Sequence, residues 1–204
     1  AGARYFAPNL WPEQPDEMRT VWETYYSEMN RLSGDLMRIF ATALDLEETW
    51  FVEKIDKHIS NFSVIHYPGQ EDITLATGQS RAGAHTDYGS LTIVQTDTDV
   101  GGLEVQTRDG SWSAVPWIPD TFAINLGDLM SEWTNDKWVS TLHRVANPPR
   151  ERANISKTSL LFFHQPNYDA LIECIPTCTD ANNPPRHAKI TSGDHVTMKI
   201  NKHR

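Results

Sequence analysis

Between Asp16 and Leu44 the hydrophobic residues recur in steps of three and four. This spacing places them along one face of an α-helix, which turns once every ~3.6 residues. Pro15 followed by Asp16 suits the start of such a helix. We therefore predict a long amphipathic helix over residues 16–44 that packs on a sheet, and a shorter helix over 46–54. The apolar positions of the long helix are Met18, Val21, Trp22, Tyr25, Met29, Leu32, Leu36, Ile39, Phe40 and Ala43.

After His58 the pattern changes to short runs rich in β-branched and aromatic residues, separated by turn-forming residues. Many short runs at this spacing are typical of a β-sandwich or barrel. Asp109-Gly110 lies between two of them, as expected for a hairpin turn. Helices first and strands afterwards predict an α+β, mainly β, fold in which the long helix braces one sheet. The predicted strands are 62–67, 91–96, 103–106, 112–115, 122–126, 143–145 and 159–163.

The length and composition indicate one globular domain. The chain has 204 residues, of which 39% are hydrophobic and 22% charged, and this suffices for one substantial core. We expect a single domain over residues 1–204, with a helical bracing part at 1–56 and a β-rich core at 57–204. No run approaches the ~18 apolar residues of a membrane span, and residues 1–10 do not resemble a signal peptide.

The charge and the cysteines narrow the possible partners. The formal net charge is −9, and the basic residues do not form the stripe that a nucleic-acid-binding protein usually shows. Cys174 and Cys178 are too few for a disulfide framework and are expected to be free thiols. We therefore expect a cytoplasmic monomer that binds neither nucleic acid nor a membrane. The densest basic group is predicted to be a solvated C-terminal tail: Lys199, Lys202, His203 and Arg204.

His85-Thr86-Asp87 and the later His143 offer two imidazoles and one carboxylate. If residues 85–87 are part of a strand, His85 and Asp87 lie on the same face, because side chains alternate along a strand. Two histidines and one carboxylate are the ligands that hold non-haem Fe(II) on one face and leave other positions open. Zn(II) accepts the same atoms, so the ligand set alone does not choose the metal.

The surroundings of these residues resemble the 2-oxoglutarate/Fe(II)-dependent dioxygenase superfamily, in its isopenicillin N synthase-like branch. The resemblance runs from about Asn61 to the C-terminus. It is carried in order by His85–Gln95 (HTDYGSLTIVQ), Gly101–Val105 (GGLEV), Asn125–Met130 (NLGDLM) and His143-Arg144-Val145.

This resemblance implies a distorted double-stranded β-helix, or jelly roll. It also implies that His85, Asp87 and His143 are the metal ligands and catalytic residues. The implied cofactors are Fe(II), 2-oxoglutarate as co-substrate, and O2. Members of the family are usually longer at the N-terminus, so we expect this chain to lack the leading part of the family domain.

The resemblance also implies which residues bind 2-oxoglutarate. The family has Arg-x-Ser before a Phe-Phe pair, and here Lys157-Thr158-Ser159 stands at that place. Lys157 and Ser159 are therefore expected to bind the far carboxylate of 2-oxoglutarate, although lysine lacks the planar fork of arginine. Arg152 is the competing cation. Tyr67 matches the family tyrosine that reaches the co-substrate, whereas Ile65 replaces an asparagine that the family often has two residues earlier.

The implied reaction is oxidation of a small organic molecule, by hydroxylation, desaturation or cyclisation, with release of succinate and carbon dioxide. The carboxylate of Asp87 argues against halogenation, because halogenating relatives have a small residue there. The alternatives are an iron-dependent oxidase that does not use 2-oxoglutarate, a catalytically silent jelly-roll binding module, and a zinc hydrolase. Asn125 and Asp128 are expected to serve strand and turn structure. The sequence does not identify substrate-binding residues.

Overall fold

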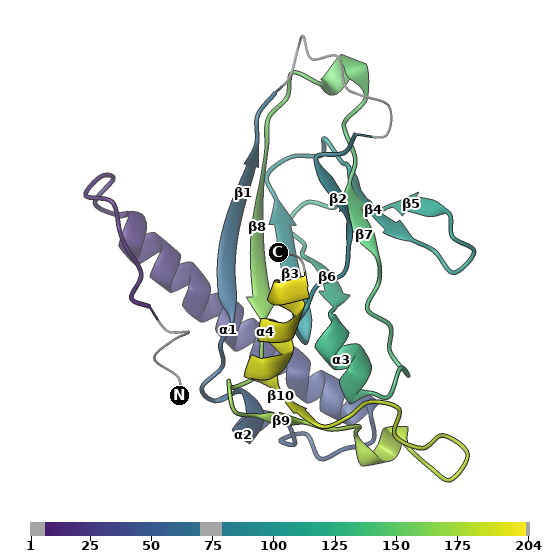
Figure 1. The fold of residues 1–204 in the computed structure, drawn as a ribbon. Coiled ribbons are helices and arrows are strands. Elements are labelled where there is room, and N and C mark those ends of the chain that lie inside the picture. Colours follow the sequence, from purple (N-terminus) through teal and green to yellow (C-terminus); the bar gives the residue numbers. More distant parts are fainter. Residues whose placement is uncertain (1–6, 70–78, 203–204) are drawn as a thin grey trace.

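Two four-stranded antiparallel sheets form the body of the protein (Figure 1). The computed structural model describes residues 7–69 and 79–202. The major sheet has the strand order β1-β8-β3-β6 and the minor sheet the order β2-β7-β4-β5. This arrangement confirms the predicted mainly β jelly roll. The strands are β1 (Asn61–Tyr67), β2 (Ala82–His85), β3 (Leu91–Thr96), β4 (Leu103–Gln106), β5 (Trp112–Ala114), β6 (Ala123–Leu126), β7 (His143–Val145) and β8 (Lys157–His164).

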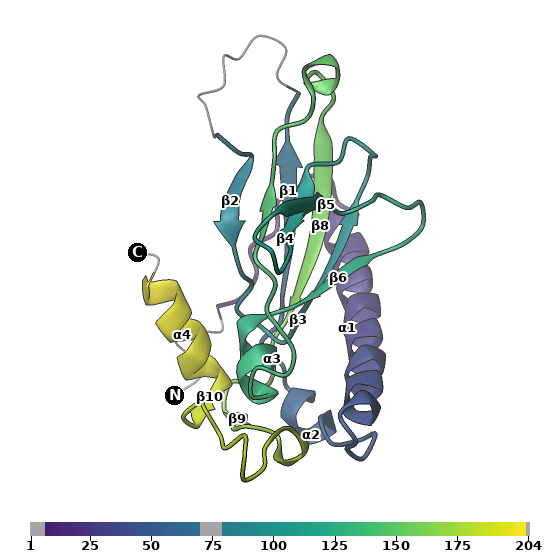
Figure 2. The ribbon, with the colours of Figure 1, turned by 90° about the vertical axis from the view of Figure 1, so that its right-hand side faces the viewer.

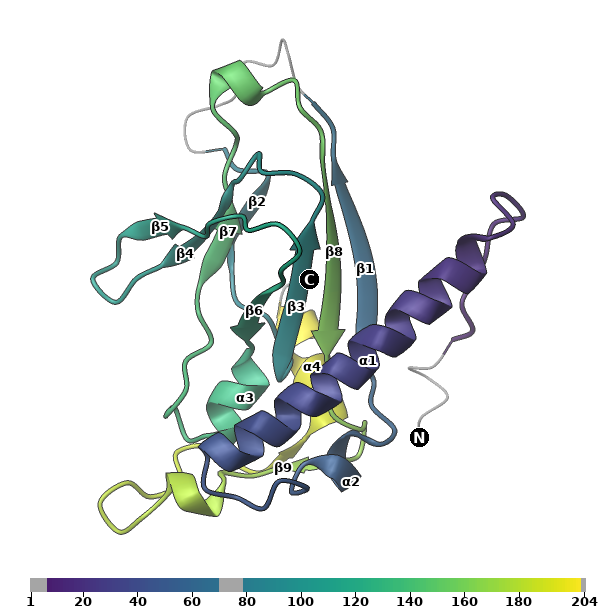
Figure 3. The ribbon, with the colours of Figure 1, turned by 180° about the vertical axis from the view of Figure 1, so that it is seen from behind.

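Helix α1 (Met18–Ala43) lies across the outer face of the major sheet (Figure 3). Its aromatic side chains pack on those of the strands. The ring centroids of Tyr26 and Phe162 are 5.3 Å apart, and those of Trp22 and Phe62 are 5.2 Å apart. The predicted long helix and its bracing role are thus confirmed, within two residues at its start. The predicted second helix forms only the single turn α2 (Val52–Ile55).

Alternation along the strands decides which side chains of the major sheet face the minor sheet. Phe162 faces α1, so Phe163, the next residue of β8, faces inward. Ser159 and Lys157 lie an even number of residues before Phe163 on β8 and share its face. Tyr67 pairs directly with Lys157 across β1 and β8, and it therefore lies on the same inner face. The three predicted co-substrate residues thus share the face of the major sheet that is turned toward the minor sheet.

Sequence patterns did not reveal three elements that shape the site. β2 contains Ala82-Gly83-Ala84 and lacks the β-branched residues that mark a strand. Its pairing with β7 in the minor sheet makes it a strand. Helix α3 (Asp128–Trp133) has six residues, too few for a periodic signal. The third element is helix α4 (Ser192–Lys202). The remaining elements are β9 (Leu171–Ile172), β10 (Ile190–Thr191), η2 (Arg150–Arg152) and η3 (Pro176–Cys178).

Helix α4 lies on the opposite side of the strands from α1 (Figure 2). Its His195 is fully buried, and the Nε2 atom of His195 lies 3.3 Å from Oε1 of Glu132 on α3. Lys199, on the next turn, binds Asp128 at the start of α3. The prediction of a solvated basic tail was therefore wrong for Lys199, while His203 and Arg204 lie outside the described residues. Within residues 7–69 and 79–202, no helix is both long and apolar enough to cross a membrane.

Candidate metal centre and co-substrate pocket

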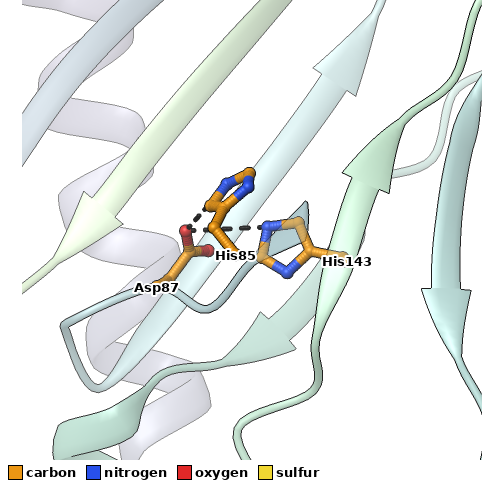
Figure 4. A group of neighbouring side chains, drawn as sticks. All are labelled: His85, Asp87 and His143. Atoms are coloured by element: carbon orange, nitrogen blue, oxygen red, sulfur yellow. Dashed lines mark ion pairs between the residues drawn. The ribbon is translucent and has the colours of Figure 1, made fainter. Parts of the chain in front are cut away.

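The structure brings His85, Asp87 and His143 together (Figure 4). His85 is the last residue of β2 and pairs with His143, the first residue of β7. The condition that residues 85–87 belong to one strand is not met, because β2 ends at His85 and Asp87 lies in the following loop. The three side chains nevertheless point toward one another (Figure 4).

The three polar groups are close enough to share one ion. The Oδ1 atom of Asp87 lies 3.7 Å from Nε2 of His143 and 4.0 Å from Nε2 of His85. One ligand atom from each residue can be chosen so that all lie within 4.8 Å of one another. The side chains of Asp87 and His143 are 6% and 12% exposed, whereas that of His85 is 47% exposed. The cluster is therefore buried on one side and open on the other.

Both histidines are oriented by main-chain carbonyl groups. The Nδ1 atom of His85 lies 2.8 Å from the carbonyl oxygen of Gly83, and Nδ1 of His143 lies 3.0 Å from that of Thr141. A carbonyl oxygen only accepts hydrogen bonds, so each Nδ1 carries the proton and donates. In the neutral ring, each Nε2 atom then has a free lone pair and faces Asp87. This is how metal-binding histidines are commonly oriented in proteins.

The carboxylate of Asp87 is held through its other oxygen atom. Oδ2 accepts hydrogen bonds from Oγ1 of Thr92, at 2.6 Å, and from Nδ2 of Asn125, at 2.8 Å. Thr92 and Asn125 are directly opposite each other on β3 and β6. Oδ1 is thereby turned toward the two imidazoles. Sequence reasoning gave Asn125 only a structural role, and no local pattern connects it with Asp87.

The first turn of α3 fixes the loop that carries Asp87. The amide of Asp128 donates to the carbonyl oxygen of Asp87 at 2.7 Å, and the amide of Leu129 donates to that of Tyr88 at 3.2 Å. Gly127 allows this close approach, since a Cβ atom at this position would lie 2.2 Å from the carbonyl oxygen of Gly89. The HTDYG and NLGD segments of the sequence are therefore in contact. The amides at the start of α3 hold the loop that contains Asp87.

An open pocket of about 880 Å³ adjoins the three residues. Leu142 and Phe163 form part of its apolar wall, and α4 supplies further wall residues, including Lys199. Lys199 donates to Oδ2 of Asp128 at 2.8 Å. Burial by itself would raise the pKa of Asp128, but hydrogen bonds from Lys199 and Thr86 outweigh it and the pKa is lowered. The ion pair between Lys199 and Asp128 therefore holds α4 beside the candidate metal centre.

Lys157 is a buried cation on the inner face of the major sheet. It is 3% exposed, and Nζ donates to the carbonyl oxygen of Gly101 at 2.8 Å. Gly101 and Gly102 have φ angles of 77° and 92°, which favour glycine and shape the turn that presents this carbonyl. Burial lowers the pKa of Lys157, and the nearby charge of Arg81 lowers it further, while Asp97 opposes them.

The competing cation Arg152 is already engaged. It lies on the 3-10 helix η2, forms an ion pair with the side chain of Asp99, and donates from Nη1 to the carbonyl oxygen of Asp99 at 3.1 Å. Lys157, in contrast, belongs to none of the ion pairs found within 4.0 Å among the described residues. Among the described residues, Arg152 is thus a paired cation outside the sheets, whereas Lys157 is a cation between the sheets that has no acidic partner.

The two-sheet jelly roll, with two histidines and an aspartate facing one another between its sheets, defines a scaffold of the non-haem metal oxygenase class. Residues 58–166 match the model of the 2OG-Fe(II) oxygenase superfamily, and the chain belongs to this superfamily. The suspected family is therefore confirmed, and the isopenicillin N synthase-like branch is consistent with it. Fe(II), 2-oxoglutarate and O2, the predicted cofactors, are those of the superfamily.

Two enzymes and one crystal structure illustrate how similar this chain is to other proteins. Validamycin A dioxygenase of Streptomyces hygroscopicus subsp. limoneus is 31% identical over 97% of this chain and 54% of its own length. A homoarginine-6-hydroxylase of Oryza sativa subsp. japonica is 34% identical over 94% of this chain and 58% of its own. The crystal structure of a Neurospora crassa protein in complex with alpha-KG matches with a TM-score of 0.92 and 30% identity, covering 100% of this chain and 64% of the Neurospora chain. The chain thus spans a little more than half the length of these curated relatives.

Proposed function

We propose that this chain carries the catalytic core of a 2-oxoglutarate-dependent Fe(II) dioxygenase. The enzyme would oxidise a small organic molecule and release succinate and carbon dioxide. One observation carries the proposal: Nε2 of His85, Nε2 of His143 and Oδ1 of Asp87 face one another, while the other polar atom of each side chain is already hydrogen-bonded. Membership of the superfamily supports it.

His85, Asp87 and His143 would hold the iron. When bound, the iron would supply the activation of dioxygen, which protein side chains do not perform themselves. The protein's part is to fix the ligand atoms. The Nδ1–H groups orient both imidazoles, and Thr92 and Asn125 turn the free oxygen of Asp87 toward them. A donor set preorganised in this way binds a metal without reorganising the loop.

Lys157, Ser159 and Tyr67 would bind 2-oxoglutarate. All three lie on the inner face of the major sheet, where the buried ammonium group of Lys157 has no ion-pair partner among residues 7–69 and 79–202 and so favours an anion. The hydroxyl groups of Ser159 and Tyr67 can donate to the same carboxylate. Burial raises the pKa of Tyr67, although Arg81 partly opposes this, so its hydroxyl stays protonated and able to donate near neutral pH.

The substrate would occupy the pocket beside His85. Its walls combine apolar side chains from Leu142 and Phe163 with Val196 and Ile200 of α4, which would keep water away from the reacting atoms. Three relatives have names or complexes that mention validamycin A, homoarginine and thymine, which supports a small organic substrate. The rice relative is named a hydroxylase, which favours hydroxylation over desaturation and cyclisation.

The metal site is tested by replacing His143. Wild-type protein should bind one equivalent of Fe(II) under anaerobic conditions and convert 2-oxoglutarate to succinate with a member of a panel of small organic molecules. His143→Ala should lose both properties. His187→Ala is the matched control, because His187 pairs with Asp136 away from the site and its loss should change neither. Iron-dependent succinate formation by His143→Ala would contradict the proposal.

The co-substrate assignment needs a separate comparison. Lys157→Ala should raise the 2-oxoglutarate concentration needed for half-maximal turnover far more than Arg152→Ala, because Arg152 already pairs with Asp99. The opposite ranking would move the co-substrate site to Arg152. Oxygen uptake without 2-oxoglutarate consumption would instead identify an iron-dependent oxidase, and an absence of oxygen uptake with bound iron would favour the silent binding module.

A further inference from the structure

A second cation, Arg81, lies beside Lys157. Arg81 directly precedes β2, and its guanidinium carbon lies 5.7 Å from the centroid of the Tyr67 ring. Its Nη2 atom is 3.4 Å from the carbonyl oxygen of Pro68, the residue after β1. Tyr67 pairs directly with Lys157 across β1 and β8, a register in which facing Cβ atoms are about 5 Å apart. Arg81, Tyr67 and Lys157 therefore gather at one end of the two sheets.

The two cations have no counter-ion in the part of the chain that the structure describes. Neither Arg81 nor Lys157 takes part in an ion pair within 4.0 Å among residues 7–69 and 79–202. The Nε atom of Arg81 is buried, and no described residue forms a hydrogen bond with it. Asp97, the acid that favours the charged form of Lys157, is exposed, and its Oδ1 atom already accepts from the amide of Thr158 at 2.9 Å.

Two neighbouring cations that have no acidic partner among the described residues cost free energy unless an anion binds between them. The pKa of Lys157 reflects this cost. Burial lowers it most, and the charge of Arg81 lowers it further. Lysine also offers only a compact ammonium group, whereas a carboxylate fits best against a planar fork of N–H donors. Arg81 carries such a fork, and its Nε atom donates to no other described residue.

We propose that Arg81 is a second co-substrate-binding residue, which together with Lys157 holds the far carboxylate of 2-oxoglutarate. The proposal rests on the proposed function and adds a residue that the Lys-x-Ser segment does not contain. Arg81 supplies the fork that Lys157 lacks. His85 lies at the other end of β2, so one short strand connects the cation to the candidate metal centre and sets their separation. The site therefore selects 2-oxo acids that carry a second carboxylate.

The test is calorimetric binding to protein loaded with Zn(II), which accepts the same ligand atoms and permits no turnover. Arg81→Gln should weaken 2-oxoglutarate binding by roughly 10- to 100-fold, the range expected for losing a hydrogen bond between charged groups. Binding of 2-oxobutyrate, which lacks the far carboxylate, should not change. Arg81→Lys should recover only part of the affinity. Arg152→Gln, the matched control, should stay within about twofold of wild type, because Arg152 is already paired with the exposed side chain of Asp99.

The possible failures are distinguishable. If Arg81→Gln binds 2-oxoglutarate as well as Arg152→Gln does, or loses 2-oxobutyrate affinity equally, the role of Arg81 is wrong while the proposed function stands. If wild-type protein does not bind 2-oxoglutarate, or if Lys157→Gln binds it with wild-type affinity, the proposed co-substrate site itself is wrong. Should Arg81→Gln fail to fold, as judged by circular dichroism, Arg81→Lys decides: unchanged affinity would contradict the need for a planar fork.

Discussion

The backbone N–H of Asp128 donates a 2.7 Å hydrogen bond to the carbonyl oxygen of Asp87. This bond ties the candidate metal ligand to the first turn of α3. The other end of α3 is held by Trp133, which is fully buried and lies with its ring centroid 5.0 Å from that of Phe51. The position of Asp87 therefore depends on the packing of the hydrophobic core as well as on its own hydrogen bonds.

Gly127→Ala should disturb this connection. The backbone of Gly127 has an ordinary extended conformation (φ −97°, ψ 175°), but the new Cβ atom would lie 2.2 Å from the carbonyl oxygen of Gly89. We expect a loss of about 1–3 kcal/mol in the free energy of unfolding, typical of overpacking, and weaker metal binding as the Asp87 loop moves. Urea unfolding and Zn(II) titration measure the two effects.

Gly34→Ala is the control for this change. Gly34 lies inside α1, where an added Cβ atom meets nothing within 4 Å. The same substitution should therefore stabilise the protein by up to ~1 kcal/mol through helix propensity and leave metal affinity unchanged. Wild-type metal affinity in Gly127→Ala would contradict the proposed link between α3 and Asp87.

Thr92→Val and Asn125→Ala should each weaken metal binding by roughly 10- to 100-fold, the usual effect of removing a hydrogen bond to a metal ligand. Both side chains donate to Oδ2 of Asp87, so their loss frees the carboxylate to rotate. Thr92→Ser keeps the hydroxyl group and should retain most of the affinity. Equal affinities in Thr92→Val and Thr92→Ser, measured by competition with a chelator, would show that the hydroxyl group does not position Asp87.

Lys199→Met should loosen α4. Lys199 is 21% exposed and pairs with Asp128, which is 14% exposed, so the pair is less screened by solvent than a surface pair. We expect faster hydrogen exchange of the amides of residues 192–202, with no change in α1. Lys189→Met removes a surface pair with Glu173 and should leave the exchange of α4 as it is. Unchanged exchange in Lys199→Met would show that His195 and the apolar contacts suffice to hold the helix.

His164 should make the protein sensitive to acid. Complete burial, assisted by the nearby His58, lowers the pKa of His164 to about 3 from 6.5. Between these values the unfolded chain binds more protons than the folded protein, so stability falls as the pH is lowered through this window. The full effect is on the order of 5 kcal/mol. The neutral ring is held by Ser90, whose Oγ atom lies 2.6 Å from Nδ1 of His164.

The measurement is the free energy of unfolding of metal-free protein between pH 7 and pH 4. His164→Asn removes the titrating group, so its stability should change less with pH than that of wild type, even if it is lower throughout. His187→Gln, at a site partly open to solvent, should keep the wild-type slope. Parallel curves for wild type and His164→Asn would exclude His164 as the source of acid sensitivity.

Local patterns in the sequence were enough for most of the fold. The bounds of β3, β4 and β7 agree with the predicted runs, and α1 begins within two residues of its predicted start. These elements have a strong periodicity or a dense run of β-branched and aromatic residues. Such signals depend only on residues that are close together in the sequence. β2 and α3 lacked such signals, whereas the 11-residue α4 has an amphipathic pattern that was not predicted. The residues His85, Asp87 and His143 could likewise be chosen from the sequence, because their chemistry and the motifs around them are local.

The sequence by itself thus determined the long helix, most of the strands and the chemical identity of the candidate metal centre. Only the tertiary structure decided how that centre is supported. The hydrogen bonds of Thr92 and Asn125 to Asp87, the pairing of Lys199 with Asp128, and the approach of Arg81 to Lys157 all join residues on different elements. Such contacts depend on strand register and on how the two sheets and α4 come together. No periodicity along the chain encodes them, since they exist only once the whole fold has formed.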